Sequence, residues 1–203
     1  DKAFFNMRGG RVGLGSMDSV PIRFYIGGDN KWTIGTGGNL TATASGVGID
    51  FQPSNSTSGV TVSASSVLDS YEVGLWTPVV ADAVSGGNTA TPGTALGRYT
   101  RVGRIVQFSC VVGNIDTTGL TGGLTLYIQG LPFPSVAVAG WKPMTVMMDT
   151  LTFSGQVVGI IGQNESAIRF KQFASGGADS DVAVSAVSSG STDIHVQGVY
   201  EVA

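Results

Sequence analysis

The stretch Ile194-His195-Val196-Gln197-Gly198-Val199-Tyr200-Glu201-Val202 decides the fold class of this chain. Ile194, Val196 and Tyr200 alternate with polar residues, which is the two-residue period of a β-strand. One face of such a strand is buried, and the other is exposed to solvent or lies at a subunit contact. This stretch therefore predicts a sheet with a core on one side.

Comparable runs recur from about Gly74 onward, separated by clusters of Gly, Pro, Asn and Asp at intervals typical of all-β sandwiches. The predicted strands are Leu75 to Val80, Tyr99 to Val102, Ile105 to Val112, Leu124 to Ile128, Met144 to Asp149, Gln156 to Ile161, Ala167 to Phe173, Val182 to Val187 and Ile194 to Val202. No window of a dozen residues has helical apolar spacing free of Gly and Pro. We therefore expect an all-β protein whose residues 76–203 form a jelly-roll-like β-sandwich head.

Residues 1–75 differ from the rest because short apolar pairs alternate with glycine, as in Tyr25-Ile26-Gly27-Gly28 and Trp32-Thr33-Ile34-Gly35. Glycine makes up 31 of the 203 residues, or about 15%, whereas its usual share in soluble domains is about 7%. Pieces so short and so rich in glycine do not form stable strand pairs alone. Three copies wound around one axis would supply the missing surface, so we expect an intertwined trimeric stem.

Charge and composition exclude several kinds of partner. The formal net charge is −3 and the 11 Lys and Arg residues are scattered, so no nucleic-acid partner is expected. Apolar runs fall short of the roughly 18 residues needed to cross a bilayer, so no membrane insertion is expected. One cysteine and one histidine supply neither a disulfide nor the usual zinc ligands, and we predict no cofactor and no metal.

Two places in the sequence hold residue types used in acid–base catalysis. Asp69 and Glu72 supply two carboxylates, but nothing near them suggests a cleft or companion groups. His195 has only Asp193 as a nearby residue of hydrolase type, and a surface or intersubunit polar contact fits it better. We therefore predict no enzymatic activity and no catalytic residue.

Three further features have both a structural and a functional interpretation. Cys110 lies on the apolar side of its run and is expected to be a buried thiol. Trp141, between Gly140 and Pro143, is expected to plug the base of the sandwich or a subunit interface, rather than form an exposed platform for a sugar ring. Asp179-Ser180-Asp181 offers alternate oxygen ligands that suit calcium, but a solvated turn is the simpler interpretation.

A more specific signal lies in Leu68-Asp69-Ser70-Tyr71-Glu72-Val73-Gly74-Leu75-Trp76-Thr77-Pro78, which follows Gly48-Ile49-Asp50-Phe51 and a Ser/Thr-rich stretch. It resembles the junction of many bacteriophage tail fibres, which usually reads LDDYEEGTWTP. It departs from that pattern because Ser70 and Val73 replace acids and Leu75 replaces a threonine. These departures leave the fold expectation intact but weaken any role for charge at the junction.

Two downstream segments continue the resemblance. The run Gly97-Arg98-Tyr99-Thr100-Arg101-Val102-Gly103-Arg104-Ile105-Val106 is similar to a strand pair of that family, and Gly130-Leu131-Pro132-Phe133-Pro134 is similar to its GLPF motif. The match covers roughly residues 46–134. It implies a homotrimeric tip on the virion that binds a bacterial surface glycan or an outer-membrane protein, with the rest of the fibre N-terminal to it.

The chain begins at Asp1 rather than Met, and we expect it to be a piece of a longer protein. Two alternatives to a non-enzymatic attachment protein stay open. One is a tailspike-type polysaccharide depolymerase, which needs paired carboxylates in a groove, normally on a longer repeat scaffold. The other is a purely structural fibre segment.

Candidate receptor-binding residues follow from counting strands, because the family's recognition loops are variable and no residue carries over. If neighbouring strands are antiparallel and the chain reverses at Gly103-Arg104, the end far from the stem receives residues 81–97, 113–123, 150–155 and 174–181. In or beside these connections lie groups suited to sugar hydroxyls and ring faces: Asn88, Asn114, Asp116, Asp149, Phe153 and Asp179.

A bulge at Gly103 would change that count. Residues 99–112 would then form one bent strand. The far end would instead be built by residues 129–143, 162–166 and 188–193, including Trp141, Asn164 and Glu165.

Overall fold

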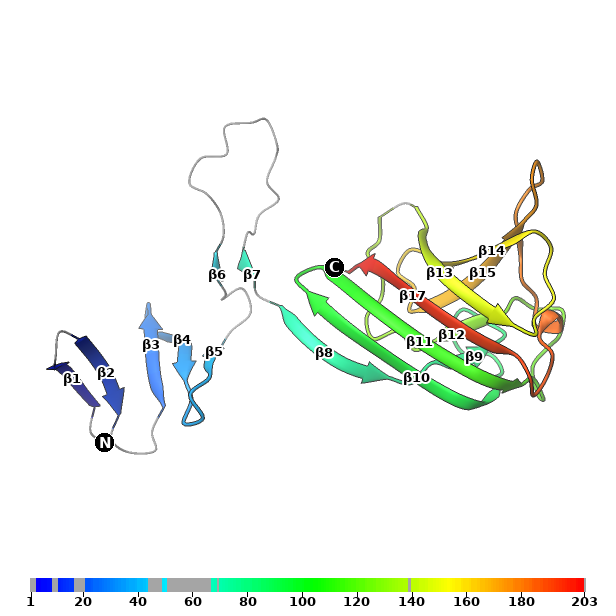
Figure 1. The fold of residues 1–203 in the computed structure, drawn as a ribbon. Coiled ribbons are helices and arrows are strands. Elements are labelled where there is room, and N and C mark those ends of the chain that lie inside the picture. Colours follow the sequence, from blue (N-terminus) through cyan, green and yellow to red (C-terminus); the bar gives the residue numbers. More distant parts are fainter. Residues whose placement is uncertain are drawn as a thin grey trace. The chain divides into compact units, whose positions relative to one another are not determined.

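A computed structural model describes residues 3–8, 11–16, 21–43, 49–50, 67–68, 70–138 and 140–202 of the chain. The chain divides into two compact units, Asp1–Ser70 and Tyr71–Ala203. The second unit, which we call the head, therefore begins five residues before the boundary expected between residues 75 and 76. Figure 1 shows the strands of both units.

Three small antiparallel sheets make up the described part of the first unit. Their strands are β1 (Ala3–Arg8) with β2 (Arg11–Ser16), β3 (Ile22–Ile26) with β4 (Asp29–Ile34) and β5 (Leu40–Ala42), and β6 (Ile49–Asp50) with β7 (Val67–Leu68). Gly27 and Gly28 join β3 to β4 with φ angles of 65° and 88°, the positive values that a two-residue hairpin turn needs. The glycine pair in this segment is thus a tight turn.

The sheet β3–β4–β5 has no core of its own. No residue between 21 and 43 is buried, and the apolar side chains of Tyr25 and Ile26 are 58% and 68% exposed. A sheet of this size needs a buried apolar face to be stable. This segment therefore needs a further apolar surface to pack against. The sequence analysis expects other copies of the chain to supply that surface, and the intertwined trimeric stem stays a prediction.

The head consists of one curled ten-stranded sheet (Figure 1). Its order is β8 (Tyr71–Trp76), β10 (Thr91–Val102), β11 (Ile105–Asp116), β17 (Asp193–Glu201), β13 (Lys142–Asp149), β14 (Gln156–Ile161), β15 (Ala167–Phe173), β12 (Tyr127–Gln129) and β9 (Val79–Ala81), with β16 (Ser180–Asp181) paired to β15. All these pairs are antiparallel. The strand β13 joins the two halves, because its first residues pair with β14 and its last with β17.

The prediction of an all-β protein is confirmed. Within the described residues there is no α-helix, and the only helical element there is the short 3-10 turn η1 (Val184–Ala186). No helix in that part of the chain has the length and apolar character to cross a membrane.

The hydrophobic core of the head lies inside the curl and takes side chains from both halves of the sheet. Phe108 of β11 packs edge-to-face on Trp76 and on Tyr200, with ring centroids 6.3 and 5.7 Å away. Each such aromatic pair adds about 0.5–1.5 kcal/mol beyond the apolar area it buries. Cys110 is buried in the same core, as predicted.

Most predicted strands are present, and three differ from the prediction. The predicted strand Leu124 to Ile128 is reduced to β12, which begins only at Tyr127. Gln156–Ile161 and Ala167–Phe173 match their predicted limits. The predicted strand Leu75 to Val80 is split into β8 and β9 at Pro78, which has no N–H to donate to a ladder. The predicted strand Val182 to Val187 is replaced by η1, so the chain does not cross the sheet there.

Candidate functional site

The strand ladder fixes which loops share an end of the head. Tyr71 pairs with Val102 across β8 and β10, at the end where β10 turns into β11. The turn at Gly103, whose φ is 57°, is a true reversal, so the alternative of one bent strand is wrong. Asp116 and Asp149 therefore lie at the opposite end of the sheet, which we call the distal end.

Three of the predicted site residues meet at the distal end through the loop of residues 188–193. The backbone N–H of Asn114 donates to Asp193 Oδ1 at 2.7 Å, and Ser189 Oγ donates to Asp116 Oδ1 at 3.2 Å. Asp149 pairs with Asp193 in the ladder. The count with a reversal at Gly103 did not place residues 188–193 at the distal end, and this part of it is wrong. The chain forms η1 instead of a strand at Val182 to Val187, so it crosses the sheet one time fewer than predicted and residues 188–193 lie at the distal end.

Asn88 has a structural role in the loop between β9 and β10. Its side-chain Nδ2 and its backbone N–H donate to the two carboxylate oxygens of Asp82, at 2.9 and 2.8 Å. The backbone N–H of Thr121 donates to Asp82 Oδ2 at 3.0 Å. These bonds, that of the Asn88 side chain foremost, lower the pKa of Asp82 and keep it ionised although it is only 4% exposed. The amide nitrogen of Asn88 is therefore already engaged within the head.

Phe153 and Asp179, the other two predicted residues, do not belong to this group. Phe153 is 44% exposed in the connection between β13 and β14. Asp179 precedes β16 and forms an ion pair with Lys171 of β15. The structure thus distributes the six predicted residues over several separate places on the head.

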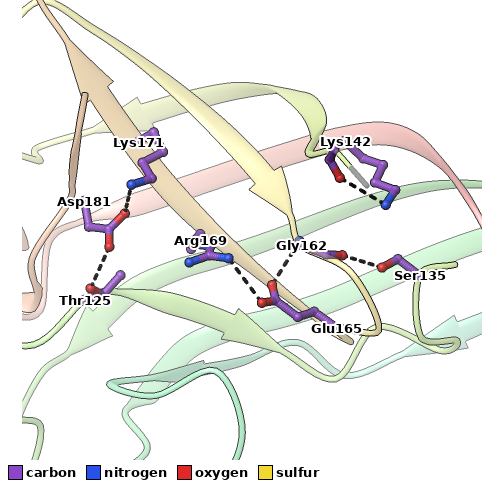
Figure 2. A network of polar contacts seen from close by, with 9 residues as sticks. Thr125, Ser135, Lys142, Gly162, Glu165, Arg169, Lys171 and Asp181 are labelled. Carbon is purple, nitrogen blue, oxygen red and sulfur yellow. Dashed lines mark hydrogen bonds and ion pairs between the residues drawn. The ribbon is translucent and has the colours of Figure 1, made fainter. Parts of the chain in front are cut away.

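Lys171 of β15 is the centre of a group of polar contacts with Asp179 and Asp181, which lie at β16, and with Thr125, which precedes β12. Its Nζ lies 2.9 Å from Asp179 Oδ2 and 2.7 Å from Asp181 Oδ1. The hydroxyl of Thr125 donates to Asp181 Oδ2 at 3.2 Å (Figure 2). The bond to Asp181, followed by that to Asp179, raises the pKa of Lys171, whose side chain is only 16% exposed. Lysine therefore occupies the two carboxylates that the sequence suggested for calcium.

Trp141 lies over this group. Its ring centroid is 5.4 Å from Lys171 Nζ, a cation–π contact, and the residue is 57% exposed. The expectation that Trp141 plugs the base of the sandwich is therefore wrong for a single chain. We refer to Trp141, Lys171, Asp179, Asp181 and Thr125 as the Trp141 cluster.

A second ion pair lies beside the Trp141 cluster. Arg169, two residues before Lys171 on β15, has Nη2 3.1 Å from Glu165 Oε1, and Glu165 Oε2 accepts the backbone N–H of Gly162 at 2.9 Å (Figure 2). Both side chains are about four-fifths buried, at 22% and 21% exposure. Glu165 is therefore fixed in the turn between β14 and β15.

The outer side of β8, β10, β11, β17 and β13 carries a set of exposed apolar side chains among polar ones. Alternation and register place its exposed apolar members on one side of the sheet. They are Tyr71, Val73, Leu75, Leu96, Val102, Ile105, Met147 and Val199, which we call the apolar face. Two hollows of about 770 and about 360 Å³ lie on it and share Arg98, Ser109, Thr145 and Gln197 in their lining. His195 is exposed on the same side, between Val111 and Met147 in the ladder.

The possible catalytic pair at the junction receives no support. Glu72 accepts a hydrogen bond from the Tyr99 hydroxyl, and this bond raises the pKa of that hydroxyl. Asp69 lies outside the described residues. Across the described residues, His, Cys, Asp and Glu form no group of three or more that could hold a metal ion.

Sequence reasoning missed two residues that organise these sites. Lys171 was not singled out, because the alternation of Ala167 to Phe173 does not reveal that β16 folds back beside it. Asp82 follows an apolar run without any motif, although it ties two loops together. Of the partners of Asp82, Thr121 lies 39 residues away along the chain.

Scans of family models and searches of curated proteins and of solved structures find no match to this chain.

Proposed function

We propose that this chain is the stem and the receptor-binding head of a bacteriophage tail fibre. It would act as a homotrimer on the virion, outside the cell, and attach to a bacterial surface glycan or outer-membrane protein without catalysis. Residues 1–75 would form an intertwined stem that continues into the rest of the fibre. The curled sheet would serve as a jelly-roll-like sandwich head.

The observation that carries this proposal is that residues 21–43 and the head each expose apolar side chains. Residues 21–43 bury no side chain, and the head presents the apolar face. Burying apolar surface yields about 25 cal/mol per Å². Other copies of the same chain would cover these surfaces. Closed rotational symmetry supports such an arrangement.

Attachment itself is supported by the chemistry of the exposed loops. Amide, carboxylate and aromatic groups lie on a rigid antiparallel scaffold, which is the usual composition of a surface that binds sugars or loops of another protein. Three heads on one stem would raise avidity, because each binding event holds the next site at a high effective concentration. Stable attachment to a cell would then require only weak binding at each single site.

Sedimentation equilibrium tests the oligomer. We expect a mass three times the 20.8 kDa of one chain, and a stably folded monomer would contradict the proposal.

Binding of the labelled protein to a panel of bacterial strains tests attachment. We expect saturable binding to some strains and competition with the unlabelled protein. An oligomer that binds no cell would favour a structural segment, and new reducing ends from bacterial polysaccharide would favour a depolymerase.

A further inference from the structure

We infer that the Trp141 cluster is a binding subsite for a neutral pyranose ring, with Trp141 as the stacking platform and Asp179 as the hydrogen-bond acceptor for its hydroxyls. The inference rests on the proposed attachment function for the source of the sugar, a surface polysaccharide. The binding chemistry itself comes from the described residues.

Trp141 has the properties of a stacking platform. It is 57% exposed at the start of β13, although indole is among the largest apolar side chains. The ammonium of Lys171 lies over the ring, 5.4 Å from its centroid, and more than half of the residue stays exposed. The C–H face of a pyranose is apolar and fits a flat aromatic surface, while its hydroxyls need polar partners at the rim.

Asp179 supplies those polar partners. Its Oδ2 is 2.9 Å from Lys171 Nζ, and its side chain remains 43% exposed. A carboxylate has about four acceptor positions, so Asp179 can keep this ion pair and accept from two neighbouring hydroxyls. Asp181 is a positioning residue, because its oxygens are engaged by Lys171 and by Thr125.

The group is organised before any ligand arrives. Lys171 is held by two carboxylates, and its side chain is only 16% exposed. Its position over Trp141 therefore fixes the platform relative to the acceptor. Binding then orders few rotatable side chains, which reduces the entropic cost of forming the complex.

The charge of the surroundings selects a neutral ligand. Lys171, Arg169 and Lys142 carry three positive charges, and Asp179, Asp181 and Glu165 carry three negative charges, so the balance is zero. Lys171 and Arg169 are already paired with these carboxylates, and Lys142 Nζ lies 3.2 Å from the carbonyl oxygen of Gly140. A uronic or sialic acid would bring a further negative charge next to Asp179, which is unfavourable.

Ligand-observed saturation-transfer NMR on the full 203-residue chain tests the subsite. The probes are the methyl glycosides of glucose, galactose and mannose, with methyl glucuronide as the charged counterpart. We expect at least one neutral glycoside to bind saturably and more tightly than the glucuronide. Trp141→Ala should weaken that binding about tenfold or more, and Asp179→Asn should weaken it several-fold. Trp141→Phe should keep part of it.

The control is Val84→Ala, which trims another exposed apolar side chain of the head and should leave the affinity unchanged. Circular dichroism checks that each variant keeps its fold. Absence of binding by all three neutral glycosides would overturn the subsite. So would tighter binding of the glucuronide, or a loss with Val84→Ala and not with Trp141→Ala.

Binding of the same variants to bacterial cells separates this inference from the proposed function. If no glycoside binds through Trp141 and the protein still coats cells, attachment stands and the subsite is wrong. If the protein binds glycosides through Trp141 but coats no strain, the subsite stands and the attachment function is wrong.

Discussion

Gly97 lies opposite Trp76 in the β8–β10 pair, and a Cβ at this position would overlap the indole. Trp76 is 8% exposed inside a packed core, so the ring has little room to move. We expect Gly97→Ala to lower the free energy of unfolding by about 1–3 kcal/mol in thermal melts. Gly123→Ala is the control, because its Cβ would meet nothing within 4 Å. Equal melting temperatures for the two variants would contradict the overlap.

Cys110 should be chemically inert in the folded head. Burial raises the pKa of its thiol to about 12, so the reactive thiolate is scarce at mildly alkaline pH. We expect iodoacetamide to label Cys110 only after denaturation, as measured by intact mass. One equivalent of label on the native protein would show that the core opens at this strand.

Asp82 gives the head a predictable response to acid. Hydrogen bonds from Asn88 and Thr121 lower its folded-state pKa below the ordinary 3.8, so its contribution to stability is present above that value. The contribution is lost as the pH falls through the folded-state pKa. We expect Asp82→Asn to lower the melting temperature at neutral pH, with a gap that closes under strongly acidic conditions. A gap that is independent of pH would contradict this account.

At the scale of elements, β8 places Leu75, which is 67% exposed, on the apolar face. A carboxylate there would have to be desolvated when another copy covers the face, which is costly. We expect Leu75→Asp to leave the head folded and to shift the sedimenting mass downward. Val84→Asp changes an apolar residue outside this face, at 41% exposure, and should not alter the mass. The same mass for both variants would exclude the apolar face as a contact between copies.

Element prediction from the sequence succeeded where a run both alternates and ends at a turn residue. β14 and β15 have such limits and were predicted residue for residue. Val182, Val184 and Val187 are equally apolar, but they are buried around a 3-10 turn instead of a strand. Apolar spacing reports burial, and a short turn can bury the same side chains as a strand.

The candidate site was predictable only in part, because its contacts join residues that are distant in sequence. The sequence pointed to Trp141 and to Asp179 separately, and it favoured a buried role for the tryptophan. What brings them together is the pairing of β15 with β16, which puts Lys171 beside Asp181. Pairing partners depend on the whole sheet, so local patterns do not reveal them.

At the scale of the whole molecule, the two units should behave differently when they are separated. The head has its own core, whereas residues 21–43 bury no side chain. We expect a fragment of residues 71–203 to melt cooperatively and a monomeric fragment of residues 1–70 to show no cooperative transition by circular dichroism. A cooperative melt of monomeric 1–70 would mean that this part needs no other copies.

The way the chain enters the head has a mechanical consequence. Tyr71 starts β8, and all six residue pairs that β8 makes with β10 lie along the line from that entry point toward the distal end. Tension between the entry point and the distal loops would run parallel to the strands and perpendicular to their hydrogen bonds. Such a force loads the six β8–β10 pairs in shear, so that they must break together and not one after another. The head should therefore resist tension applied along its strands.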